Sequence, residues 1–474
     1  MITKMETFTS LLPHQEQAVE KLKHLKIGAL YMEMGTGKTR TALELIKLRL
    51  AAGKVNRVIW LCPCNIKSDI HRGIREHSNL DDLGILDVVG IETLSSSVRE
   101  CSRLLQIVQN NRTYLIVDES SLVKNHAALR TIHIQQLANA CAYKMILNGT
   151  PISRNEADLY AQWCILDWRI LGYRSYYSFA ANHLEYDDRG RIRRVLNTDY
   201  LAEKIAPYTY QVKKADCFTL PEKHYHTQYC GMKLWQNQVY DKVLDNLLFD
   251  LNEMSNTAIY QLFGALQAVI SGYVVSIQYQ RLDPHAIRER YVSDPEENPR
   301  LAALLSSISG NEEKTIIFCQ YTDEIDTIVR LIRGSGRSAV AFNGEMSIKK
   351  RNAAIDAFRG DTQYFVSNKS CGAFGLNLQF CHKIIFYSHD WNWGTRAQAG
   401  DRVHRLGQTH DVDITDICMD DSIDVQILKC LEKKENLSDT FKREVAHLQK
   451  KDLRSFLRGK EVKHGEDLPE KKCV

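Results

Sequence analysis

A short glycine-rich segment near the N-terminus has the residue types needed to hold a phosphate group. Gly35 and Gly37 allow the backbone to approach an anion closely, so that consecutive N–H groups can point at it. Lys38 supplies a positive charge for β- and γ-phosphates, and the Thr39 hydroxyl can bind Mg²⁺. An apolar run over Ile27–Tyr31 precedes the segment, and methionine stands at the first glycine position of the full pattern. The segment predicts nucleotide binding; the alternative is an ordinary strand-to-helix turn.

Two adjacent carboxylates follow another apolar run. Residues Tyr114–Val117 lead directly into Asp118 and Glu119, so the run predicts a buried strand with both acids at its carboxyl end. Ligands bind at this edge of open α/β sheets. Asp118 is suited to Mg²⁺, and Glu119 to accepting a proton from an attacking water molecule. A solvated strand end is the alternative for such a pair taken alone.

Two arginines near the end of the chain could meet the charge that develops in phosphoryl transfer. Arg402 and Arg405 lie three residues apart within the segment 398–408, and on a helix they would share one face. A guanidinium stays protonated, which suits it to stabilise a γ-phosphate in the transition state. A solvated basic helix face is the simpler interpretation of these two residues.

Composition excludes several classes of protein without identifying one. The 474 residues include 62 Lys and Arg against 58 Asp and Glu, and the net charge of +4 is too small to indicate a polyanion partner. Thirteen cysteines, an odd number, lie mostly in apolar runs and favour a reducing compartment. We find neither a signal peptide nor a run of about 18 apolar residues. We therefore expect an intracellular, cytoplasmic protein with no membrane segment.

Apolar runs alternate with amphipathic stretches in two regions of the chain. The first region has runs at 58–62, 114–117 and 144–147, and the second has runs at 315–318, 338–342, 364–367 and 384–387. Such runs between helices predict parallel sheets covered on both faces. The fold class is therefore α/β, with two doubly wound lobes and a mostly helical segment between them.

An ordered set of motifs resembles the Snf-type (Swi/Snf-related) ATPases of helicase superfamily two from about Leu11 to Ser422. Besides the segments above, the matching stretches are Leu12–Gln15, Asp118–Asn125, Leu147–Ile152, Ser370–Leu378, Asp390–Asn392 and Gln398–Gln408. The resemblance implies two RecA-like lobes, ATP and Mg²⁺ as cofactors, and double-stranded DNA as a partner bound without strong sequence specificity. It implies nothing about a protein partner, and one chain suffices for activity.

The resemblance also distributes roles among individual residues. It assigns ATP binding to Gln15, which would read adenine, and to Gly35, Thr36, Gly37, Lys38, Thr39 and Arg40. It assigns Mg²⁺ to Thr39 and Asp118, and catalysis to Lys38, Glu119, Arg402 and Arg405. It assigns coupling of ATP state to DNA contacts to Gly149, Thr150, Gly375, Asn377, Gln398 and Gln408. Candidate DNA contacts are Lys67, Thr150 and Trp391.

The motifs imply an arrangement of domains, and three of them depart from the family pattern. We expect lobe 1 over 1–222 with a helical insertion at about 158–215, a helical linking region over 223–297, lobe 2 over 298–440 and a charged helix and tail over 441–474. Ser121 stands where the family has His, Asn148 stands where it has Thr, and Trp393-Gly394 replaces the Pro that follows Trp-Asn in the family. None of these changes removes a predicted Mg²⁺ ligand, the base or an arginine.

The leading hypothesis is a DNA-stimulated ATPase that translocates on double-stranded DNA and remodels protein–DNA or DNA structures. ATP hydrolysis would be tied to the approach of the second lobe, which carries the arginines. A strand-separating DNA or RNA helicase is one alternative. A nucleic-acid-binding regulatory protein, which uses nucleotide as a switch with little turnover, is an alternative from another class.

Overall fold

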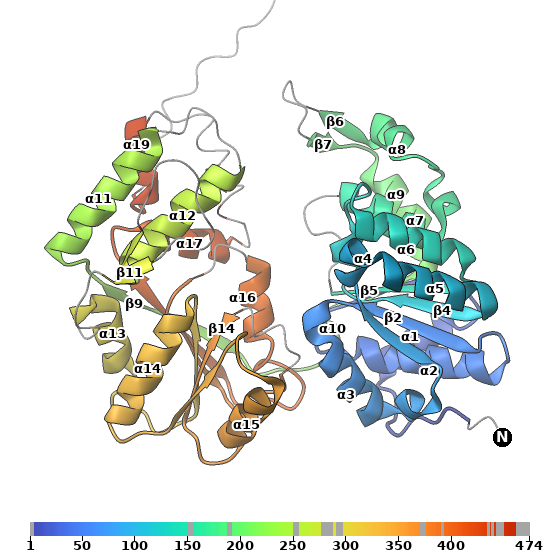
Figure 1. Cartoon of the computed structure of the whole chain (residues 1–474), viewed down its shortest axis with the longest axis horizontal. Helices are drawn as coiled ribbons and strands as arrows, with labels where there is room; N and C mark the ends of the chain where they lie inside the picture. The colour runs from blue at the N-terminus through green and yellow to red at the C-terminus, as the bar shows by residue number, and fades with distance from the viewer. Residues whose placement is uncertain are drawn as a thin grey trace, which may run out of the picture. The chain divides into compact units, whose positions relative to one another are not determined.

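The protein divides into two compact units, Met1–Thr219 and Leu220–Val474. The computed structural model describes residues 4–149, 156–186, 192–249, 256–275, 288–290, 297–369, 376–389, 393–433, 437, 440–441 and 450–460. In this part of the chain, no helix is both long and apolar enough to cross a membrane. Figure 1 shows the helices and strands of both units.

The first unit is built on a sheet of six parallel strands in the order β3-β2-β4-β5-β1-β8. The strands are β1 (Ile27–Met32), β2 (Arg57–Cys62), β3 (Leu86–Gly90), β4 (Thr113–Val117), β5 (Tyr143–Asn148) and β8 (Thr209–Val212). Most of their residues are buried, which is why they appear in the sequence as continuous apolar runs. All carboxyl ends therefore lie at one edge.

Helices cover both faces of this first sheet. On one face, α1 (Pro13–Leu22), α2 (Lys38–Ala51) and α3 (Lys67–His77) pack in a core with β1 and β2. On the other face, α5 (Val98–Asn110), α6 (Leu129–Ala140) and α7 (Leu159–Leu171) form a second core. The short helices α4 (Thr93–Ser96) and α10 (Lys214–Cys217) and the 3₁₀ turns η1 (Cys64–Ile66), η2 (Leu80–Leu83), η3 (Ser120–Val123), η4 (Glu156–Asp158) and η5 (Ala206–Tyr208) complete the connections.

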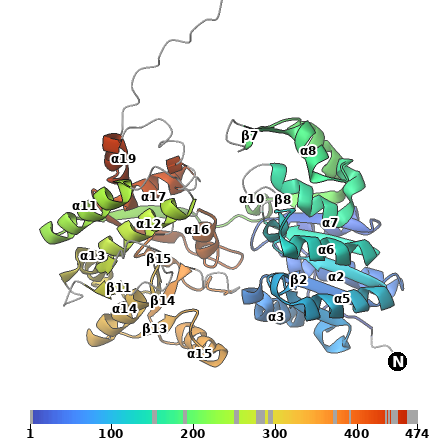
Figure 2. The ribbon, with the colours of Figure 1, turned by 45° about the horizontal axis from the view of Figure 1, so that its top comes forward.

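The segment expected as a helical insertion contains strands as well as helices. Helices α8 (Tyr176–His183) and α9 (Thr198–Ile205) flank an antiparallel pair, β6 (Leu184–Tyr186) and β7 (Ile192–Val195). Helix α8 and the β6–β7 pair lie at the end of this unit away from α3 (Figures 1 and 2). The segment then returns to the main sheet as β8, which pairs with β1. The insertion is therefore not helical throughout.

The second unit contains another sheet of six parallel strands, in the order β13-β14-β12-β15-β16-β9. The strands are β9 (Lys223–Cys230), β12 (Thr315–Cys319), β13 (Ala339–Phe342), β14 (Tyr364–Asn368), β15 (Lys383–Phe386) and β16 (Val412–Met419). Helices α13 (Pro299–Ile308) and α14 (Thr322–Gly334) cover one face, and α15 (Ile348–Arg359) and α16 (Trp393–Gly400) cover the other. The two sheets confirm the expected fold class.

The segment expected as a helical linking region is joined closely to the second unit. Its first residues form β9, which pairs with β16 over eight residues, so the expectation of a helical region starting at residue 223 is wrong there. Helices α11 (Leu234–Phe249) and α12 (Asn256–Ile270) follow and share a core with α17 (Ile423–Glu432) and α19 (Lys450–Leu457). A short antiparallel pair, β10 (Tyr273–Val275) and β11 (Arg288–Arg290), comes next.

Candidate active site

The glycine-rich segment forms the turn between β1 and α2. Gly35 and Gly37 have φ angles of 84° and 87°, in the left-handed region that glycine adopts without steric cost. Gly37 is the N-cap of α2 and no side chain caps the helix, so its first N–H groups are available to an anion. The Lys38 Nζ donates to the Met32 carbonyl over a distance of 2.9 Å. The left-handed glycines, the start of α2 and Lys38 thus lie together in one turn.

The N-terminal motif packs directly on this loop. The Gln15 Nε2 donates to the Thr36 carbonyl at 3.1 Å, and the His14 Nε2 lies 2.7 Å from the same oxygen. Both side chains are buried. Gln15 therefore lies where it can hold the glycine-rich loop in position.

Arg40, predicted as an ATP contact, has another set of partners. Its guanidinium donates to the Thr9 carbonyl at 2.6 Å and to the Glu44 carboxylate at 2.9 Å, and the side chain is buried. These bonds fasten the segment that precedes Gln15 onto α2. The structure therefore gives Arg40 a supporting position beneath the loop.

The two carboxylates follow β4 at the carboxyl edge of the sheet. Asp118 is buried, and its Oδ1 accepts from the Glu119 N–H at 2.9 Å. Burial and the adjacent Glu119 carboxylate raise the pKa of Asp118 to about 6, while nearby Lys38 opposes this shift. A divalent cation at Asp118 would offset both causes, and a buried carboxylate oxygen is a donor that Mg²⁺ accepts.

Glu119 has a left-handed backbone conformation, with a φ of 49°. This conformation is uncommon for any residue except glycine, and the surrounding structure must hold it in place. Strain of this kind gathers at functional sites, which agrees with the role of proton acceptor predicted for Glu119.

The end of β5 comes close to the glycine-rich loop. A Cβ placed on Gly149 would lie 4.0 Å from the Lys38 Nζ and 3.9 Å from the Met34 nitrogen. Asn148, which departs from the family pattern, is buried, and its Nδ2 lacks a hydrogen-bond partner among the described residues. Thr150 lies outside the described residues. The first sheet thus brings Lys38, Asp118 and Gly149 to one edge.

The arginines of the second unit do not lie on a helix. Helix α16 ends at Gly400, and the residues that follow form turns, with Gly407 at a φ of 94°. The expectation that Arg402 and Arg405 share a helix face is therefore wrong. The arginine turn, residues 401–408, instead packs on the segment 377–381. The Arg405 guanidinium donates to the Asn377 Oδ1, and the Leu378 N–H donates to the Arg402 carbonyl at 3.1 Å.

The remaining residues predicted for coupling or DNA contact lie at separate places in the fold. The buried Gln408 Nε2 donates to the Cys381 carbonyl at 2.9 Å, which fastens the arginine turn, while Gln398 is exposed on α16. Lys67 is half-buried at the first position of α3. Gly375 and Trp391 lie outside the described residues.

Residue patterns did not reveal two contacts that hold the arginine turn. The His404 Nε2 lies 2.8 Å from the Pro221 carbonyl, and the Lys223 Nζ lies 3.5 Å from the Asp401 carboxylate. The two contacts join residues that are 183 and 178 positions apart in the sequence. The Leu220–Lys223 stretch was the only signal for these contacts, and nothing in the sequence indicated that it would meet the arginine turn.

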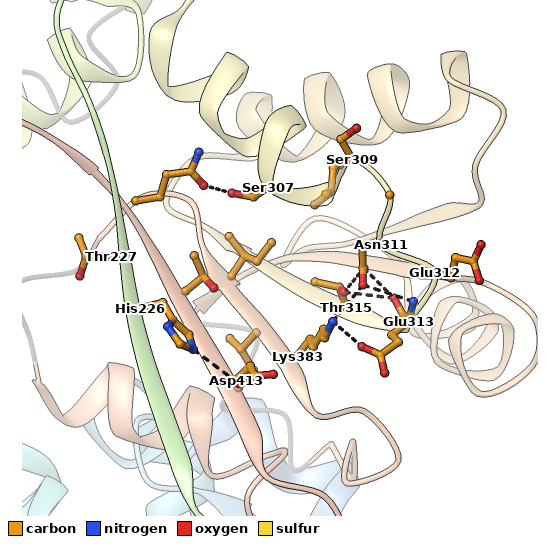
Figure 3. Close-up of a pocket in the computed structure, with 16 residues that line it drawn as sticks. His226, Thr227, Ser307, Ser309, Asn311, Glu312, Glu313, Thr315, Lys383 and Asp413 are labelled. Atoms are coloured by element: carbon orange, nitrogen blue, oxygen red, sulfur yellow. Dashed lines mark hydrogen bonds and ion pairs between the residues drawn. The ribbon is translucent and has the colours of Figure 1, made fainter.

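A cavity of about 780 Å³ in the second unit has no predicted site residue in its lining (Figure 3). It lies near Thr315 and Lys383, the first residues of β12 and β15, whereas ligands bind at carboxyl ends in such sheets. The Lys383 ammonium is paired with Glu313 and donates to the Asn311 Oδ1 at 3.2 Å. We therefore do not assign this cavity to the nucleotide.

Comparison with protein families matches three regions of the chain. Residues 86–270 match the SNF2-related domain, residues 298–407 match the helicase conserved C-terminal domain, and residues 8–76 match the res subunit of type III restriction enzymes. The first two matches lie in the regions that carry the carboxylates and the arginine turn.

Known proteins resemble the chain over most of its length. It is 22% identical to an uncharacterized ATP-dependent helicase of Bacillus subtilis, across 91% of this chain and 79% of that protein. It is 24% identical to the ISWI chromatin-remodeling complex ATPase of Saccharomyces cerevisiae, across 88% of this chain and 39% of that protein. A solved structure, the SWI2/SNF2 ATPase core of Sulfolobus solfataricus with double-stranded DNA, is 18% identical with a TM-score of 0.41 and covers 96% of this chain and 98% of that one.

Proposed function

Because the chain belongs to the SNF2-related ATPases of helicase superfamily two, we propose that it hydrolyses ATP to translocate on double-stranded DNA. The chain spans less than half of the yeast relative, and what that protein does as a whole is not carried over. The proposal concerns the motor activity alone, with remodelling of protein–DNA or DNA structures as its outcome.

One observation carries the ATPase part of the proposal. The glycine-rich loop, the Asp118–Glu119 pair and Gly149 converge at the carboxyl edge of a single parallel sheet, with Lys38 close to both Gly149 and Asp118. In this arrangement the loop and Lys38 bind the phosphates, and the N-terminus of α2 favours their negative charge. Glu119 accepts the proton of the attacking water molecule.

Mg²⁺ belongs to the same proposal. Thr39 and Asp118 would hold the ion, which supplies positive charge against the phosphate oxygens when it is bound. Arg402 and Arg405 of the second unit add cationic charge during turnover, and their turn is held in place by Asn377 and Gln408.

Duplex DNA is the proposed partner, contacted mainly through its phosphates. Lys67, Thr150 and Trp391 remain the candidate contacts. The relative from Saccharomyces cerevisiae is the ATPase of a chromatin-remodeling complex, which supports a duplex over RNA. One chain is proposed to suffice.

Steady-state ATP turnover with and without duplex DNA tests this function. We expect hydrolysis that duplex DNA stimulates and that Lys38→Ala abolishes, because the ammonium contacts the transferred phosphate. Single-stranded DNA and RNA serve as matched nucleic-acid controls. Negligible turnover with every nucleic acid, despite ATP binding, would instead support the nucleotide-switched regulatory protein.

A further inference from the structure

Helix α7 makes two buried hydrogen bonds through adjacent residues. One leads to the residue after Glu119, and the other leads to the strand before the glycine-rich loop. The Ser120 Oγ donates to the Gln162 Oε1 at 2.6 Å, and the Trp163 Nε1 donates to the Tyr31 hydroxyl at 3.1 Å. Each of the four side chains is at most 1% exposed. Such bonds specify one arrangement of the groups, since breaking either leaves a buried polar atom without a partner.

The Ser120 bond lies next to the predicted base. Ser120 directly follows Glu119, whose left-handed conformation has to be held by its neighbours. The amide of Gln162 is oriented by a second bond, in which its Nε2 donates to the Asp158 carbonyl at 2.9 Å. This orientation presents the Oε1, and not the NH₂ group, to the Ser120 hydroxyl.

The Trp163 bond anchors the same helix to the strand that leads into the phosphate loop. Tyr31 lies in β1 immediately before Met32, and the Met32 carbonyl is the acceptor for Lys38. Helix α7 is therefore fixed relative to Lys38 at the point where Gln162 reaches Ser120.

Two further contacts join the residues after Glu119 to the same region. The Lys124 Nζ lies 3.5 Å from the Asp158 carboxylate, and the His126 ring stacks on Tyr176 with a centroid distance of 3.7 Å. Ser120, Lys124 and His126 are thus held by α7, by the residue that caps it and by the first residue of α8.

We propose that Ser120 and Gln162 are positioning residues that hold the Glu119 carboxylate where it accepts the proton from water. This inference rests on the proposed ATP hydrolysis. Neither residue touches ATP; each acts through the backbone of Glu119. Their loss displaces the base during turnover and leaves the phosphate loop, which binds ATP in the ground state, in place.

The test compares Ser120→Ala, Gln162→Met and the double variant. Each single variant is expected to lower the DNA-stimulated kcat about tenfold or more while the KM for ATP changes less than about twofold. Binding of a fluorescent ATP analogue should be unchanged. In the double variant neither partner of the Ser120–Gln162 bond is left over, although the Asp158 carbonyl still loses the Gln162 donor. The melting temperature should therefore recover part of the way toward that of the original protein while kcat stays low.

Tyr114→Phe is the matched control. It removes another buried hydroxyl from the same unit, one that contacts the Met145 sulfur near the amino end of β4. We expect this variant to keep the original kcat. A merely structural role for Ser120 and Gln162 predicts that kcat recovers together with the melting temperature in the double variant, which would overturn the proposal.

The same experiment separates the two levels of the proposal. If the unaltered protein hydrolyses ATP and Lys38→Ala does not, but both single variants keep full kcat, the positioning role is refuted and the ATPase stands. If the unaltered protein shows no hydrolysis with any nucleic acid, the proposed function fails and the positioning role fails with it.

Discussion

Single residues of the candidate site depend on backbone conformations that few residue types adopt. The sequence predicted the glycine-rich loop because glycine at positions 35 and 37 is itself the signal for a left-handed turn. The conformation of Glu119 could not be predicted, since no residue pattern marks a glutamate with a φ of 49°. The Ser120–Gln162 hydrogen bond, which we propose holds Glu119 in position, joins residues that are 42 positions apart in the sequence.

Gly37 offers a direct test at this scale. A Cβ at this position would lie 2.1 Å from the Gln15 Nε2, in addition to the strain of a φ of 87°. We expect Gly37→Ala to displace Gln15 and weaken the binding of a fluorescent ATP analogue at least about tenfold. The loop can relieve the left-handed strain, which costs roughly 1–2 kcal/mol, only by leaving its present conformation.

Gly53→Ala is its matched control. Gly53 also has a positive φ, of 63°, but no atom lies within 4 Å of an added Cβ. This variant should lose stability to a similar backbone strain while its ATP affinity is retained. Equal ATP affinity in Gly37→Ala and Gly53→Ala would contradict the assigned role of the loop.

At the scale of helices and strands, the sequence predicted those strands whose residues are buried on both faces of the sheet. Strands β1, β2, β4 and β5 are apolar because helices cover both faces of their sheet, and each appeared as a continuous run. Strand β9 was missed because it lies at the edge of its sheet and carries exposed residues such as Tyr225 and His226. An edge strand has no two-sided cover to impose an apolar run.

The arginine turn was misassigned as helix for a different reason. Arginine and glutamine favour helices, so the segment after Gln398 has a helical composition. Tertiary bonds from Arg405 to Asn377 and from Gln408 to the Cys381 carbonyl instead hold it as turns. These bonds join residues 28 and 27 positions apart, which local patterns do not record.

Arg405→Ala tests the function of this turn. We expect kcat for DNA-stimulated hydrolysis to fall about a thousandfold, because a cation that stabilises the γ-phosphate in the transition state is lost. Arg333→Ala is the control, since among the described residues that guanidinium donates to the Ala339 carbonyl of the same unit, at 2.9 and 2.8 Å. A kcat that is equal in the two variants would remove Arg405 from the catalytic set.

A buried ion pair between α13 and α17 should govern the stability of the second unit. The Arg300 guanidinium donates to the Asp424 carboxylate, and both side chains are 1% exposed. Asp424→Asn leaves the arginine charge buried and should lower the free energy of unfolding by about 3–5 kcal/mol. Urea unfolding followed by circular dichroism measures this loss.

The control for that measurement is an exposed pair on α15. Asp356 lies 4.0 Å from Arg359, and both side chains are at least half exposed. Asp356→Asn should change the free energy of unfolding by less than about 1 kcal/mol. Equal losses in the two variants would refute the importance of the buried pair.

At the scale of the whole molecule, charge is nearly balanced. The 62 basic and 58 acidic residues leave +4, and residues 450–474 hold eight Lys and Arg against five Asp and Glu, or +3 of that total. Any basic surface of the two units is therefore local and offset by acidic faces elsewhere. The motifs predicted two α/β lobes, but they did not predict the secondary structure of the segments between the motifs.

This balance predicts few phosphate contacts. Affinity for duplex DNA should fall with salt, with fewer than about six counterions released on binding. Fluorescence anisotropy across a salt series measures the slope, and Lys67→Ala should reduce its magnitude by about one. Tight binding that is insensitive to salt would contradict the phosphate-based contact proposed here.

Displacement of a third strand from a DNA triplex tests the central claim, ATP-driven translocation on duplex DNA, most directly. The account predicts displacement that requires ATP hydrolysis and is abolished by Glu119→Gln, which replaces the proposed base with a neutral side chain of the same shape. It also predicts no separation of a plain duplex under the same conditions. Rapid duplex unwinding without triplex displacement would contradict the account and identify a strand-separating helicase.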